Sequence, residues 1–108
     1  GRLRYIQSIG AGYDQFPLDT LKARGISLAN ATGVNADAVS QHAMGLILAL
    51  YRQLHTGRDN QKQKLWRGMI SDVTMREDDL CGHTVLIVGL GAIGNRLADV
   101  MSTSLDKH

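Results

Sequence analysis

Short apolar blocks and a turn mark the first part of the chain as an α/β unit. The apolar block at 3–9 predicts a strand, which the glycines at 10–12 end in a turn. A short helix is expected over 18–24, because Gly25 is the residue type that commonly follows a helix end. A second strand is expected at 26–29. Strand, helix and strand in this order predict a right-handed βαβ unit with parallel strands.

The middle of the chain carries one long helical pattern. Apolar side chains recur at helical spacing from Ala36 to Leu54, and nearly the whole circumference is apolar between Ala43 and Tyr51. A helix that is apolar all round is expected to be buried between packed bodies. Asn35, just before it, is a good N-cap residue.

Polar residues dominate the next segment, 52–69. The pattern predicts a solvated helix that is docked through the single Trp66. The alternative is an anion site formed by its basic residues, which are Arg58, Lys62, Lys64 and Arg67. Residues 71–82 are acidic and turn-prone, and they are expected to cross toward the next strand.

The most informative motif comes late in the chain, where a predicted strand at 84–88 leads into G-x-G-x-x-G. In a dinucleotide site Gly89 allows the tight turn, Gly91 lets the backbone approach the pyrophosphate, and Gly94 lets helix and strand pack closely. A helix is expected from Ala92 to Met101, and its first amides would bind phosphate. The alternative is an ordinary turn.

A dinucleotide site also needs an acidic residue about 20 residues beyond the glycines, at the end of a second strand. Asp106 is not that residue, because no apolar run separates it from the helix. The sequence therefore predicts only the first strand, turn and helix of such a domain.

Composition narrows the class of protein further. The 108 residues are 44% hydrophobic, and the net charge of +2 is spread along the chain, which disfavours nucleic acid and anionic membranes as partners. No apolar run approaches the roughly 20 residues of a membrane span. Cys81 is the single cysteine, so a reducing cytoplasm is the expected location and a small structural residue its expected role.

Four ordered motifs together resemble the D-isomer-specific 2-hydroxyacid dehydrogenases, a family that includes glyoxylate/hydroxypyruvate reductases, phosphoglycerate dehydrogenases and formate dehydrogenases. The motifs are SIGAGYD at 8–14, KARGI at 22–26, NADAVSQHA at 35–43 and LCGHTVLIVGLGAIG at 80–94. The resemblance covers nearly the whole chain, but family members are much longer.

The resemblance implies that the chain is an internal fragment with an α/β fold. Residues 1–34 would be the C-terminal part of a flavodoxin-like substrate domain, in the form of a partial βαβ unit. Residues 35–82 would be the connecting helices and linker. Residues 83–108 would be the truncated start of an NAD(P)-binding Rossmann domain.

The resemblance also implies site residues. Backbone amides of Ala11 and Gly12 would bind the substrate carboxylate, and Asn35 would contact the substrate, although helix capping is its safer role. Val39 would lie near the nicotinamide. Candidates for cofactor binding are Val39, Gly89, Gly91, Ala92, Ile93 and Gly94. Gln41 replaces a glutamate common in the family, and Ala92 replaces a frequent arginine.

The implied function of the parent is hydride transfer between NAD or NADP and a small 2-hydroxy or 2-oxo acid, in a homodimer. The fragment itself is expected to be inactive, because the catalytic arginine, glutamate and histidine of the family follow the glycine motif. Structural or surface roles are expected for the four histidines, which are His42, His55, His83 and His108. The alternative is a non-catalytic interaction or dimerisation module that uses the apolar helix.

Overall fold

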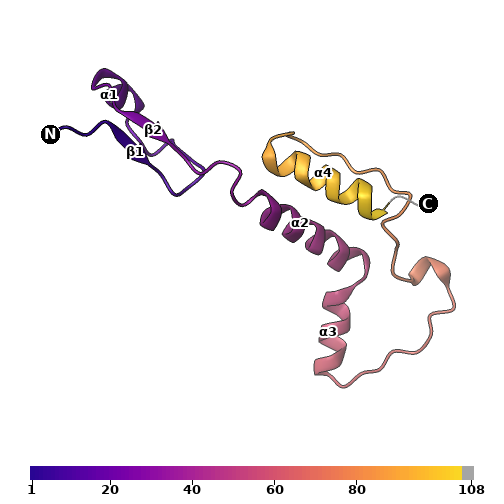
Figure 1. Ribbon diagram of the computed structural model, residues 1–108. Coiled ribbons are helices and arrows are strands. Elements are labelled where there is room, and N and C mark those ends of the chain that lie inside the picture. The colour runs from indigo at the N-terminus through magenta and orange to yellow at the C-terminus, as the bar shows by residue number, and fades with distance from the viewer. Residues whose placement is uncertain (106–108) are drawn as a thin grey trace.

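The computed structural model describes residues 1–105, and both Asp106 and His108 lie outside the described residues. The elements in chain order are β1 (Tyr5–Gln7), α1 (Leu18–Ala23), β2 (Ser27–Ala29), α2 (Ala36–Tyr51), α3 (Leu54–Lys62), a 3₁₀ turn η1 (Val73–Met75) and α4 (Ala92–Leu105). They form an elongated molecule of 72 × 37 × 18 Å, with the strands at one end and α3 turning away at the other (Figure 1).

The expected βαβ unit is present, with β1 and β2 paired in parallel and Ile6 opposite Leu28. Helix α1 ends at Ala23, one residue before the predicted end, and Gly25 follows it with a φ of +64°, a conformation that residues with a side chain rarely adopt. The amides of Gly25 and Ile26 then donate to the carbonyls of Lys22 and Leu21, at 3.1 and 2.9 Å. These two bonds satisfy the last carbonyls of α1 and turn the chain into β2.

The main apolar core lies between α2 and α4, which run side by side in the same direction (Figure 1). Met44, Leu80 and Met101 are its buried residues. An ion pair joins Asp37 in the first turn of α2 to Arg96 of α4. Because Leu80 is part of this core, the segment that leads to the glycine motif is anchored to α2.

The long helix differs from its prediction in length and burial. It ends at Tyr51, because Gln53 adopts a left-handed φ of +52° and α3 starts in a new direction. The prediction of burial on all sides is wrong: α4 covers one face, whereas Leu46 and Leu50 on α2 are 55% and 65% exposed. Periodicity shows which residues are apolar, but it does not show how many neighbours will cover them.

The prediction that Trp66 docks the polar segment is also wrong. Helix α3 ends at Lys62, and Lys64 adopts a φ of +54° that turns the chain away from the helix. Trp66 therefore lies beyond the helix and is 96% exposed.

The strand predicted at 84–88 does not form in the described part of the chain, which is a further correction. Leu86 and Val88 are 85% and 91% exposed. A strand needs a neighbour for its hydrogen bonds, and β1 and β2 pair with each other at the far end of α2 (Figure 1).

Candidate functional site

The turn at Gly10–Gly12 follows β1 and is exposed. The carbonyl of Gly10 accepts a hydrogen bond from the amide of Ala31 at 3.0 Å. The carbonyl of Ala11 accepts from Nδ2 of Asn30 at 2.7 Å. Within residues 1–105 the amides of Ala11 and Gly12 make no hydrogen bond, so both are available to an anion.

Asn30 and Thr32 support this turn, and sequence reasoning missed both. The hydroxyl of Thr32 lies 2.9 Å from Oδ1 of Asn30 and 3.4 Å from the carbonyl oxygen of Ala11. One signal was available, because both residues follow the carboxyl end of β2, the edge at which open α/β sheets bind ligands.

The glycine motif forms a turn at the start of α4, as its sequence predicts. Gly89 has a φ of +96°. A Cβ on Gly94 would lie 2.0 Å from the carbonyl oxygen of Gly89, so this helix start packs directly on the turn. A Cβ on Gly91 would meet nothing within 4 Å. The cradle beside Gly91 is therefore open, as binding of a pyrophosphate against the backbone requires.

The start of α4 faces the same cradle. Among the described residues, the amides of Gly91, Ala92 and Ile93 donate no hydrogen bond. The amide of Asn95 donates to the carbonyl of Gly91 at 3.0 Å, and its side chain donates to the carbonyl of Leu90 at 2.8 Å. The loop is thus held in place while the first amides of the helix stay available, and a helix of this length carries partial positive charge there.

The loop 30–35 lies between the two turns. Its Asn30 contacts Ala11, while the position of a Cβ on Gly33 lies 3.8 Å from Cβ of Ala92. The turn at 10–12 and the start of α4 therefore both contact this one loop. Val39, on the first turns of α2, is 37% exposed.

Asn35 occupies the N-cap position of α2, but its side chain makes no capping hydrogen bond. The expectation of side-chain capping is therefore wrong. The carbonyl of Asn35 accepts from Val39 at 2.9 Å, while the side chain is exposed.

The described histidines lie apart from both turns. His42 is exposed on α2, and His55 lies in α3. Nε2 of His83 is 3.4 Å from Oδ2 of Asp78, and its ring contacts Tyr51 edge-on with centroids 5.3 Å apart. Residues 1–105 contain no group of three His, Cys, Asp or Glu side chains that could hold a metal ion, and none of their helices is long and apolar enough to span a membrane.

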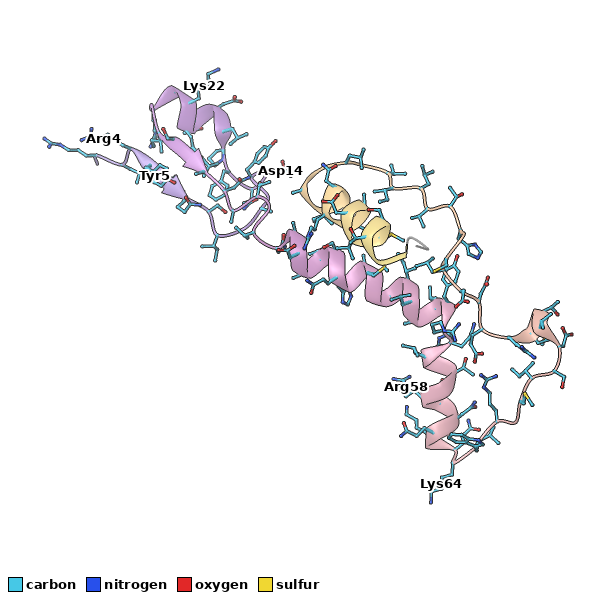
Figure 2. All side chains as sticks on the ribbon, turned by 45° about the vertical axis from the view of Figure 1, so that its right-hand side comes forward. Arg4, Tyr5, Asp14, Lys22, Arg58 and Lys64 are labelled. Atoms are coloured by element: carbon cyan, nitrogen blue, oxygen red, sulfur yellow. The ribbon has the colours of Figure 1, made fainter. Side chains whose placement is uncertain are left out.

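A groove of about 1060 Å³ lies between α3 and the segment 64–77. Arg58 pairs with Asp59 at 3.4 Å, and Arg67 pairs with Glu77, so half of the predicted basic cluster already has acidic partners. Figure 2 places Arg58 and Lys64 at this end of the molecule, and Arg4 and Lys22 at the strand end. These four basic residues are therefore divided between the two ends of the molecule.

Two carboxyl groups near this groove have pKa values that are lowered. Hydrogen bonds from its own backbone amide and then from Arg67 hold the pKa of Glu77 below its ordinary value. The hydroxyl and then the amide of Thr74 lower the pKa of Asp72 in the same way. Both effects favour the charged carboxylates at neutral pH.

Comparison with known protein families gives a match over nearly the whole chain. The model of the D-isomer specific 2-hydroxyacid dehydrogenase catalytic domain matches residues 1–105. The chain belongs to this family. Its predicted resemblance is thereby confirmed, and members of the family use NAD or NADP as cofactor.

Individual relatives extend the match. Glyoxylate reductase/hydroxypyruvate reductase of Mus musculus is 36% identical over 96 residues, which are 89% of this chain and 29% of the mouse protein. D-3-phosphoglycerate dehydrogenase of Mycobacterium bovis is 31% identical over 97 residues, 90% of this chain and 18% of the relative.

Among solved structures, D-lactate dehydrogenase from Aquifex aeolicus complexed with NAD and lactic acid superposes with a TM-score of 0.74 at 28% identity. The match covers 91% of this chain and 28% of the Aquifex chain. The chain thus spans between 18% and 29% of the lengths of these relatives. Their α/β folds agree with the predicted fold class at that level.

Proposed function

We propose that the chain is part of an oxidoreductase that transfers hydride between NAD or NADP and a small 2-hydroxy or 2-oxo acid. The observation that carries this proposal is the presence of two amide-lined turns that both lie against the loop 30–35. One turn suits a carboxylate and the other a pyrophosphate. The Aquifex relative, crystallised with NAD and lactic acid, combines a dinucleotide with an acid of this class.

Each turn has a specific task in this proposal. The amides of Ala11 and Gly12 bind the carboxylate of the acid, with Asn35 close to it. Gly89 and Gly94 shape the turn, and the backbone at Gly91 to Ile93 binds the pyrophosphate. Val39, part of whose side chain is exposed, lies toward the nicotinamide. The bound cofactor supplies the hydride chemistry, and the residues of this chain bind and orient.

In domain terms, we propose that residues 1–34 belong to a flavodoxin-like substrate domain and 35–82 connect it to a dinucleotide domain. Residues 83–108 would begin that Rossmann domain. The parallel βαβ unit supports the first assignment, and the turn at 89–94 with α4 supports the last.

We propose that the 108-residue chain by itself binds its ligands but does not catalyse hydride transfer. Acid–base catalysis needs a group within hydrogen-bond reach of the substrate, and His42, His55 and His83 all lie elsewhere. Mixing the purified chain with NADH and glyoxylate, and following NADH absorbance, should give only the background rate. Turnover that scales with chain concentration would contradict this part of the proposal.

The cofactor assignment is tested by Gly91→Val. A branched side chain there enters the open cradle but meets no atom of the chain within 4 Å. NADH binding, followed by cofactor fluorescence, should weaken at least about tenfold while the melting temperature changes little. Gly68→Val is the control, because its Cβ also meets nothing within 4 Å but lies in the distant segment 64–77. If Gly91→Val binds NADH with wild-type affinity, the motif is an ordinary turn and not a cofactor site.

A second candidate, a dimerisation or interaction module, is favoured by the apolar side chains that α2 leaves exposed. Leu46 and Leu50 lie on this surface, 55% and 65% exposed. Apolar patches on soluble proteins commonly mark contact sites. Sedimentation should therefore show self-association that Leu46→Glu combined with Leu50→Glu reduces, and a monomeric wild type would exclude dimerisation through this surface.

A further inference from the structure

Within residues 1–105, the hydrogen bonds between the loop that follows β2 and the proposed carboxylate site all end on carbonyl oxygens of Gly10 and Ala11. The Gly10 carbonyl accepts from the amide of Ala31 at 3.0 Å, and the Ala11 carbonyl accepts from the side chain of Asn30 at 2.7 Å. Both carbonyls therefore point toward the same loop.

Because the peptide bond is planar, these contacts also fix the directions of the neighbouring amides. In a trans peptide the carbonyl and the N–H of the next residue point in opposite directions. Fixing the Gly10 carbonyl fixes the amide of Ala11, and fixing the Ala11 carbonyl fixes the amide of Gly12. Both amides then point away from the loop and toward the same side, the arrangement in which successive N–H groups form an anion site.

The two contacts differ in kind. The bond to Gly10 comes from the backbone of Ala31 and does not depend on a side chain. The bond to Ala11 depends on the side-chain amide of Asn30, whose Oδ1 lies 2.9 Å from the Thr32 hydroxyl. Because Oδ1 accepts this hydroxyl and the amide of Thr32 at 3.4 Å, Nδ2 is left as the atom that faces Ala11.

We infer that Asn30, oriented by Thr32, is a positioning residue that aims the Gly12 amide at the substrate carboxylate. The inference rests on the proposed function, because it assumes that an acid binds at this turn. Asn30 acts through the peptide group between Ala11 and Gly12 and needs no contact with the acid. Its loss is expected to weaken carboxylate binding without unfolding the parallel strands, whose own hydrogen bonds are separate.

The test uses the ¹⁵N,¹³C-labelled 108-residue chain, with glycolate as probe and its uncharged amide, glycolamide, as the neutral control. Titration with glycolate should shift the amide resonances of Ala11 and Gly12, and glycolamide should not. Asn30→Ala should move the carbonyl resonance of Ala11 and weaken glycolate binding roughly tenfold, the loss of one well-oriented hydrogen bond.

Thr32 supplies the second pair of variants. Thr32→Val should weaken glycolate binding roughly threefold, whereas Thr32→Ser retains the hydroxyl and should restore wild-type affinity. Asn60→Ala, in α3, is the matched control and should change neither readout. If Asn30→Ala does not fold, Thr32→Val and Thr32→Ser decide the inference with the same two measurements.

The outcomes separate the inference from the proposed function. If the Ala11 carbonyl resonance moves in Asn30→Ala while glycolate affinity stays at the wild-type value, the positioning role is wrong and the carboxylate site stands. If the wild-type amides of Ala11 and Gly12 do not respond to glycolate, the carboxylate site is wrong and the positioning role falls with it.

Discussion

The two glycine turns of this chain are held in place by different contacts. The turn at 10–12 is held in part by side chains, since Asn30 and Thr32, in the loop that follows β2, contact the carbonyl of Ala11. The turn at 89–94 depends on the absence of a side chain, since the carbonyl of Gly89 occupies the place of a Cβ on Gly94. The first turn is thus supported from a loop 19 to 21 positions away, whereas the second is closed by its own backbone and by the neighbouring Asn95, whose side chain donates to the carbonyl of Leu90.

The segments that precede the two turns also differ. The segment before the first turn belongs to β1 and pairs with β2, because both partners lie within the first 29 residues. The segment 84–88 before the second turn has no neighbour in the described part of the chain, and its Leu86 and Val88 are largely exposed. The second turn nevertheless forms, so its geometry does not require a paired strand.

The largest expected effect comes from Gly94→Ala. Its Cβ would lie 2.0 Å from a backbone oxygen that can move only if the turn opens. We expect a loss of about 3 kcal/mol in the stability of the α2–α4 core, at the upper end for overpacking. Urea unfolding followed by circular dichroism measures this loss.

Gly45→Ala is the control for that substitution. Gly45 lies within α2, and its Cβ would meet nothing within 4 Å. Alanine there should stabilise the helix by about 0.5–1 kcal/mol. If Gly94→Ala unfolds at the same urea concentration as the wild type, the second turn is not built by close packing at Gly94.

An intermediate effect is expected from Gly25→Ala, in the unit that carries the first turn. Its φ of +64° costs an alanine about 1 kcal/mol. The hydrogen exchange of the Ser8 and Ser27 amides, which bond across the two strands, should accelerate, while the resonances of 89–94 stay unchanged. Gly25→Asn should lose less, because asparagine tolerates this conformation. Equal exchange in all three proteins would show that the helix end does not limit the stability of the unit.

The sequence predicts features whose causes are local, and it fails where the cause lies elsewhere in the chain. The end of α1 and the glycine motif follow from residue types within a few positions, such as Gly25 and Gly89. The contact of Asn30 with Ala11 joins positions 19 residues apart, so no local pattern announces it. The chain also breaks its long helix at Gln53 without a proline or glycine, and no rule of helix termination predicts that position.

Exposure was the least predictable property. Helical spacing correctly identified α2, but the spacing is the same whether one face or all faces are covered, and Leu50 is 65% exposed. Trp66 was expected to dock because aromatic side chains gain much from burial. The turn at Lys64 instead leaves it on the segment beside the groove.

The smallest expected effect concerns the acid Glu77, which lies far from both turns. Its own amide, and then Arg67, lower the pKa of the folded carboxyl. The unfolded pKa is about 4.3. The charged form therefore stabilises the folded segment fully above that pH, and the contribution is lost as the pH falls through the lowered folded value. A ¹³C titration of the Glu77 carboxyl should give a midpoint below that of glutamate in a short peptide. Arg67→Met should raise the midpoint only partly, because the amide hydrogen bond remains, and a midpoint that returns fully to the peptide value would assign the whole effect to the arginine.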